Sequence, residues 1–171
     1  MSFDGHFTAP EQIQFETYRQ VSENSNVADN DIYVLYKDTD SQIWVSVFGG
    51  GLNRLVRYDK EKREPIFKSY GMREGMNNDV VKSIVEDKNG KLWVTTESGL
   101  SCCKKASEQF RKYDKYVMFL NVEGEEGSAL RTLNGDLWIG TRQGILTFSP
   151  DKLETLHTNY DTRIVDFKVS N

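Results

Sequence analysis

One motif occurs three times in this sequence of 171 residues, and it restricts the possible fold more than any other feature. Each copy has a short run around a tryptophan, followed by a glycine and an apolar residue. The tryptophans are Trp44, Trp93 and Trp138, and the glycine–apolar pairs are Gly51-Leu52, Gly99-Leu100 and Gly144-Ile145. The tryptophans are 49 and 45 residues apart and the glycines 48 and 45, so two landmarks share one period. This agreement indicates internal repeats.

The second copy shows most clearly what one repeat contains. Asn89-Gly90 is a turn signal, because both residues accept positive φ at low cost. Leu92–Thr96 is rich in aromatic and β-branched residues, which suit a half-buried strand. A period in the forties with about four short strands is typical of a β-propeller blade. A helical repeat is disfavoured, since no window keeps apolar residues at a period of 3.6.

The sequence therefore predicts an all-β fold, a partial β-propeller of about three four-stranded antiparallel blades with the tail of a preceding blade. A ring of six to eight blades needs roughly 270 to 360 residues, so we expect a piece of a longer protein. The third copy departs from the pattern, because its lead-in over 117–126 has no Asn-Asp entry, and Ser149-Pro150-Asp151 then ends its third strand. We expect a preceding tail and connector over 1–31, blades over 32–70 and 71–116, a final blade over 117–160, and an exit strand over 161–171.

Composition excludes several function classes. The net charge of −4 comes from interspersed charges, which predicts no nucleic-acid partner. No apolar run approaches the ~20 residues of a membrane span, so we expect no membrane contact by this region. The sequence start lacks the basic and apolar segments of a signal peptide, so any export signal is expected upstream. Cys102 and Cys103 are adjacent, and no Cys/His cluster occurs, so neither a metal nor a cofactor is expected.

The repeats resemble those of a known family. Residues 78–100, NDVVKSIVEDKNGKLWVTTESGL, are similar to the two-component regulator propeller repeat, and residues 134–145, NGDLWIGTRQGI, fit part of it. The first copy departs from the pattern, with Ser41-Gln42 where Asn-Gly is expected. The final segments FSPDKL and IVDFKVSN resemble the passage from a last blade into an immunoglobulin-like three-tyrosine domain.

This resemblance implies a parent similar to the hybrid two-component sensors of Bacteroides-type bacteria. Such sensors join periplasmic propellers to a membrane helix, a histidine kinase and a receiver. The implied function is that of a non-catalytic, periplasmic sensor fragment, which senses oligosaccharides and signals to a kinase that controls polysaccharide-utilisation genes. A protein-interaction scaffold is the main alternative, because an open propeller piece exposes unpaired edges. A propeller lyase or glycosidase is the third hypothesis.

The candidate site residues differ from the residues that recur at one position in every repeat. Trp44, Trp93 and Trp138 occupy one repeat position, which favours packing between blades over stacking on sugar rings. Glu86-Asp87 and Asp38–Asp40 carry paired carboxylates, as glycosidases require, but lie where Asp bonds its own turn. We therefore expect no catalytic residue. Ligands of propellers contact loops, so the candidates are the non-repeated residues Phe48, Arg54, Arg73, Glu97, Arg142 and Gln143. The expected partners are an oligosaccharide and either neighbouring blades of the parent or further copies of this chain.

Overall fold

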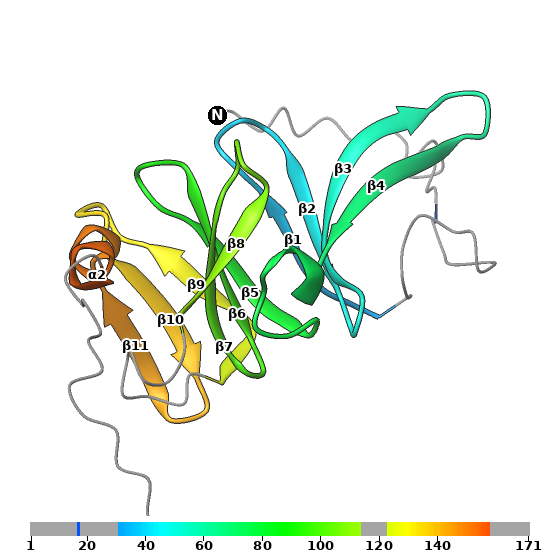
Figure 1. Cartoon of the computed structure of the whole chain (residues 1–171). Helices are drawn as coiled ribbons and strands as arrows, with labels where there is room; N and C mark the ends of the chain where they lie inside the picture. The colour runs from blue at the N-terminus through cyan, green and yellow to red at the C-terminus, as the bar shows by residue number, and fades with distance from the viewer. Residues whose placement is uncertain (1–16, 18–30, 114–122, 158–171) are drawn as a thin grey trace, which may run out of the picture.

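Three antiparallel sheets stand side by side in this computed structural model, in chain order from right to left in Figure 1. The structure describes Thr17, residues 31–113 and residues 123–157. Most of the expected preceding tail and the whole of the exit strand fall outside these residues. Each sheet follows its predecessor along the chain, and neighbouring strands are consecutive in sequence. This architecture confirms the predicted all-β partial propeller.

The first two sheets have four strands each, in the order of the sequence. The first contains β1 (Ile32–Lys37), β2 (Ile43–Val47), β3 (Gly51–Asp59) and β4 (Glu64–Tyr70). The second contains β5 (Val81–Glu86), β6 (Lys91–Thr96), β7 (Gly99–Lys104) and β8 (Gln109–Tyr113). The short 3-10 helix η2 (Met72–Glu74) connects them. The inner strands β1, β5 and β9 of the three sheets contact one another.

The third sheet has three strands in the described part of the chain, where four were expected. They are β9 (Gly124–Arg131), β10 (Leu137–Thr141) and β11 (Gly144–Phe148). A helix, α2 (Pro150–His157), follows where an outer strand would begin. Proline favours the start of a helix, where its missing N–H is not needed, and Asp151 in the first turn suits the helix dipole. Leu153 of α2 is 8% exposed and joins the core.

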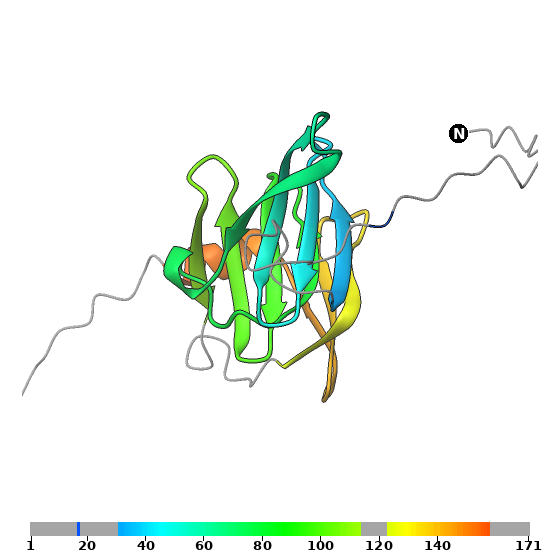
Figure 2. The same cartoon turned by 90° about the vertical axis from the view of Figure 1, so that its right-hand side faces the viewer.

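The core lies between the sheets. One apolar cluster joins the first and second sheets through residues such as Trp44, Leu52 and Ile84. A second cluster joins the second and third sheets through Trp93 and Leu137, among others. Figure 2 looks onto the first sheet, with the other two behind it. Because each blade contributes one face to each neighbour, the sheets stabilise one another rather than folding around a single centre.

Cys102 and Cys103 show how one strand serves both clusters. Both lie in β7, neither forms a disulfide, and both are buried. Cys103 packs in the first cluster and Cys102 in the second, because successive strand residues point to opposite faces. Burial raises the pKa of the Cys103 thiol to about 11. Cys103 therefore acts as a small apolar residue at neutral pH.

Candidate functional site

Four of the six predicted loop candidates, Phe48, Glu97, Arg142 and Gln143, lie at one end of the three sheets. We call this end the BC end, because it holds the turn between the second strand (B) and the third strand (C) of each sheet. This turn contacts the start of the inner strand. Three equivalent backbone hydrogen bonds fix the contact, from the N–H groups of Phe48, Glu97 and Arg142 to the carbonyls of Asp31, Val80 and Glu123, at 3.0, 3.3 and 3.2 Å. The same turn is thus anchored in the same way in all three sheets.

Bulges in the inner strands direct further side chains at this end. The register of β1 against β2 shifts between Ile32 and Val34, and that of β5 against β6 shifts between Val81 and Ser83. Tyr33 and Lys82 are the extra residues. In β9 the shift spans residues 125–128. A bulge re-aims a side chain, and bulges are over-represented beside functional sites.

The bulged residues of successive blades contact one another. The Lys82 ammonium lies 4.4 Å from the centre of the Tyr33 ring and 3.2 Å from Glu126 Oε1. It also lies 3.6 Å from Glu97 Oε1 in the neighbouring turn. Phe48 packs its ring against Tyr33, with centroids 5.7 Å apart. We call Tyr33, Phe48, Lys82, Glu97 and Glu126 the BC-end row.

The groups around Lys82 favour the charged form of its side chain. Burial acts to lower the pKa of Lys82, whose side chain is 14% exposed. The hydrogen bond to Glu126 and the negative charges nearby outweigh this effect, so the pKa is raised above its ordinary value. The BC-end row thus presents a fixed ammonium, two carboxylates and two aromatic rings. Such a set can donate and accept hydrogen bonds and cover an apolar ring face.

The remaining predicted candidates are distributed differently. Arg142 lies at the BC end and pairs with Glu123 at 3.2 Å, and Gln143 is its exposed neighbour in the turn. Arg73 is an exposed residue of η2. Arg54 does not join the BC-end row. It lies within β3, its guanidinium 5.9 Å from the Trp44 ring centre and 2.6 Å from Glu108, at the seam between two sheets.

At the opposite end, aspartates hold the turns between the first two strands of each sheet. Asp87 Oδ1 accepts the backbone N–H groups of Asn89 and Lys91, at 2.8 and 3.0 Å. Its other oxygen accepts the indole N–H of Trp93 at 2.8 Å. Asp38 does the same for its own turn and Trp44. These carboxylates therefore bond their own turns, as the sequence indicated.

Thr132 takes the place of aspartate in the third sheet. Its Oγ1 accepts the N–H of Asp136 at 3.1 Å, and it has no second side-chain oxygen for an indole. Trp44 and Trp93 are 2% and 1% exposed and pack between described sheets, whereas Trp138 is 43% exposed. Packing between blades therefore stays a prediction for Trp138. Within the described residues no further sheet covers the third one, so this tryptophan has nothing to pack against on that side.

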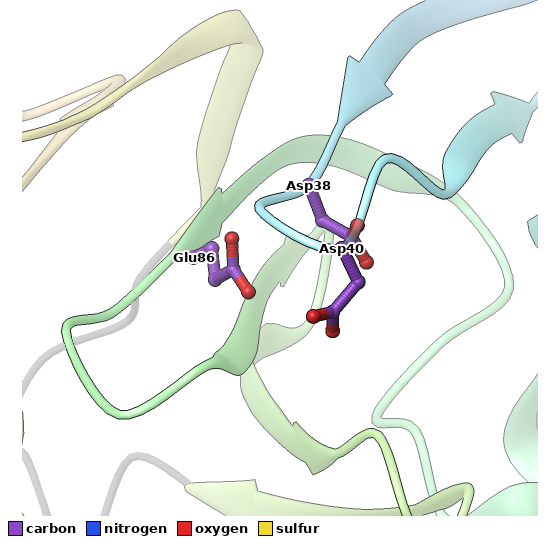
Figure 3. A group of neighbouring side chains, drawn as sticks. All are labelled: Asp38, Asp40 and Glu86. Atoms are coloured by element: carbon purple, nitrogen blue, oxygen red, sulfur yellow. The ribbon is translucent and has the colours of Figure 1, made fainter.

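Three carboxylates converge between the first two sheets, as Figure 3 shows for Asp38, Asp40 and Glu86. Their oxygens lie within 4.8 Å of one another, so they have the chemistry of a metal-ligand set. The ammonium of Lys105 already supplies the positive charge. Its Nζ lies 2.6 Å from Glu86 and 3.3 Å from Asp38, and it also bonds Asp40.

This cluster joins two blades. Thr39 donates its N–H and its hydroxyl to Glu86, each at 2.8 Å, which ties the first turn to the second sheet. Burial acts to raise the pKa of Asp38, but the hydrogen bonds from Trp44, Gln42 and Lys105 lower it below its ordinary value. The acid pair considered from sequence is therefore neutralised by a lysine and held in place. Lys105 was missed, since it lies 19 residues from Glu86 in sequence and carries no motif.

A polar hollow of about 320 Å³ lies at the same end, beside the turns of the second and third sheets. Lys88 and Arg131 line it, but each has an internal partner, Asp151 at 2.6 Å and the Asp87 carbonyl at 2.7 Å. Its described lining holds no aromatic side chain. The BC-end row is therefore the better candidate for a ligand with an apolar ring face.

Comparison with known proteins agrees with this architecture. Residues 75–98 match the family model described as the two-component regulator propeller. Over 97 residues, 57% of its length, the chain is 25% identical to histidine kinase P4 of Formosa agariphila, of which it covers 7%. No helix in the described part of the chain has the length and apolar character needed to cross a bilayer.

Two solved structures share the fold. One is the extracellular domain of a hybrid two-component system from B. thetaiotaomicron, with a TM-score of 0.60, 22% identity, and coverage of 78% of this chain and 19% of that one. Another such domain from the same organism gives a TM-score of 0.52 and 18% identity, covering 91% of this chain and 27% of that one. The chain thus spans about a quarter or less of these relatives.

Fold and repeat together define a class of protein, the β-propellers built of short four-stranded blades. Within that class, the segment that forms β5, β6 and their flanking turns matches the two-component regulator propeller model.

Proposed function

We propose that this chain is a non-catalytic sensor segment of a hybrid two-component system and works in the periplasm. One observation carries the proposal: a regulator propeller repeat lies within stacked blades whose fold is shared with extracellular domains of such systems. Signalling to a histidine kinase, and control of polysaccharide-utilisation genes through it, are parts of this proposal that concern the longer protein.

The ligand class that suits the BC-end row is an oligosaccharide. A sugar ring has one apolar face and a rim of hydroxyl groups. Phe48 is 45% exposed and offers an aromatic surface for such a face. Lys82, Glu97 and Glu126 can exchange part of their mutual contacts for hydroxyl groups. The anchored turns hold these groups in place before binding, which reduces the entropic cost of association.

The opposite end favours a structural role over hydrolysis. Glycoside hydrolysis needs one carboxylic acid and one carboxylate on either side of a sugar bond. Asp38 and Glu86 instead share the Lys105 ammonium and are nearly inaccessible, with side chains 0% and 1% exposed. Despite burial, the hydrogen bonds from Trp44, Gln42 and Lys105 keep the pKa of Asp38 below its ordinary value, which opposes the acid role.

The test is binding of a panel of defined plant and host oligosaccharides to the full chain by calorimetry. We expect one sugar class to bind, and Phe48→Ala and Lys82→Met to weaken it at least about tenfold. Lys62→Met is the matched control, because Lys62 lies in the β3–β4 turn with its side chain 71% exposed. A folded chain that binds no member of the panel would contradict the ligand class. Equal weakening by the control would contradict the site.

A further inference from the structure

Each sheet has a forward face, turned toward the next sheet in the chain, and repeat-equivalent residues build it. Strand pairing defines three such positions. They are occupied by Tyr36, Val85 and Leu130, by Trp44, Trp93 and Trp138, and by Leu52, Leu100 and Ile145. The members from the first two sheets pack in the two apolar clusters. The members from the third sheet are exposed: Leu130 by 54%, Trp138 by 43% and Ile145 by 68%.

The rear face, turned toward the preceding sheet, repeats in the same way. In the second sheet Ile84, Leu92 and Val94 form it, and all three pack in the first cluster. In the third sheet the equivalents Ala129, Leu137 and Ile139 pack in or against the second cluster. In the first sheet the equivalents are Leu35, Ile43 and Val45. Leu35 is 71% and Ile43 41% exposed, whereas Val45 is 5% exposed.

The molecule thus exposes both halves of an interface that it builds twice internally. A hollow of about 330 Å³ on the third sheet is lined by Leu130, Trp138 and Ile145, among others. The hollow lies on the forward face of the third sheet. On the forward face of the second sheet, the equivalent position is covered by the third sheet. The first sheet faces outward at the other side of the molecule, as Figure 2 shows. Leu35 there is the equivalent of Ile84, which the second sheet buries against its predecessor.

We propose that a second copy of this chain docks its first sheet onto the third sheet of the first copy. The forward face of one copy, with Leu130, Trp138 and Ile145, meets the rear face of the other, with Leu35 and Ile43. The occupant follows from the two internal interfaces, because the docked copy adds one more step of the same blade-on-blade packing. The contact joins two different surfaces, so repeated docking gives a closed ring or an open row. The proposal rests on the packing of the sheets and not on the proposed sensor function.

The test is sedimentation of the full chain from about 1 μM to about 100 μM, with single substitutions on each face. We expect the natural chain to associate as its concentration rises. Ile145→Glu on the forward face and Leu35→Glu on the rear face should each raise the dissociation constant at least about tenfold. Leu133→Glu is the matched control, since Leu133 is an apolar residue at 108% exposure in the β9–β10 turn and on neither face.

Mixing the two variants separates this geometry from others. Ile145→Glu retains an intact rear face and Leu35→Glu an intact forward face, so an equimolar mixture should form a pair and stop there. A natural chain that stays monomeric at every concentration overturns the proposal. The forward face of the third sheet would then fit a further blade of a longer polypeptide. Association unchanged by Leu35→Glu overturns it in favour of a contact between two forward faces. Circular dichroism of each variant verifies that the sheets remain folded.

Discussion

The indole N–H of Trp93 donates a hydrogen bond of 2.8 Å to Asp87, and that carboxylate also closes the turn that leads into the tryptophan's own strand. Both residues are 1% exposed. One buried carboxylate thereby links the local turn of a blade to the packing between blades. The same relationship holds for Trp44 and Asp38 and is lost in the third sheet.

Substitution of phenylalanine for Trp93 and for Trp138, which occupy equivalent positions, should change the free energy of unfolding by different amounts. Trp93→Phe leaves an Asp87 oxygen buried without its donor, so we expect a loss of about 1–3 kcal/mol in the free energy of unfolding. Trp138→Phe lies on an exposed face and should cost less than about 0.5 kcal/mol. Urea unfolding at low protein concentration measures both. Equal losses would show that the indole bond adds nothing to stability.

Removal of the inter-blade ammonium should destabilise the first two sheets. Lys105→Met leaves Asp38 and Glu86 buried without their positive partner. We expect a loss of about 3 kcal/mol, the lower end for a broken buried pair, since the Lys105 side chain is 18% exposed. Lys62→Met, at an exposed pair with Glu64, should change stability by less than about 0.5 kcal/mol. Urea midpoints compare the two, and a loss no greater than that of the control would contradict a stabilising role of the Lys105 ion pairs.

Acid should weaken the same contact. The pKa of Asp38 is lowered in the folded chain from its ordinary value of 3.8, so its contribution is complete above that pH and is lost as the pH falls through the lower folded value. The pKa of Lys105 is raised, so its contribution persists at neutral pH and is lost only in alkali, above its ordinary 10.5. Asp38→Asn should therefore be less stable than the natural chain at pH 7, and the two unfolding curves should converge in acid.

The exposed Asp31→Asn serves as the control for this pH series. We expect it to follow the natural chain at every pH. A constant gap between Asp38→Asn and the natural chain down to acid pH would contradict the role of the Asp38 charge.

Two glycines of one turn should respond differently to alanine. Both have positive φ, +68° at Gly51 and +63° at Gly49, which costs an alanine about 1 kcal/mol. A Cβ on Gly51 would lie 2.2 Å from the Tyr70 carbonyl oxygen, whereas nothing lies within 4 Å at Gly49. Gly51→Ala should therefore cost about 2 to 4 kcal/mol, because β4 must move. Thermal unfolding compares them, and similar losses would show that β4 yields freely.

The repeat made much of the fold predictable. Turn signals, alternating strands and a shared period are local signals, and they led to the sheets around Trp44 and Trp93. The turn role of Asp38 and Asp87 was predictable for the same reason, since aspartate bonds its own backbone. The helix after Phe148 was not predicted, because Ser149-Pro150-Asp151 reads equally as a strand end and a helix start.

The candidate site was only partly predictable. Phe48, Glu97 and Arg142 were found from their place in turns, whereas Tyr33 and Lys82 were missed. Both belong to inner strands, and a bulge redirects them toward the neighbouring blade. Arg54 was included because of its sequence position near a turn, yet the seam with Glu108 holds it elsewhere.

The sequence by itself determined the blade, since the period, the turns and the strand alternation depend on residues close together in the chain. Which equivalent residue is buried, and which charges pair, depends on contacts between sheets that are far apart in the chain. Lys105 reaches Asp38 across 67 residues, and Trp138 stays exposed although its pattern is that of Trp93. The physical reason is that burial and charge pairing depend on the neighbouring sheet, and a repeat specifies its own strands but not the presence of its neighbour.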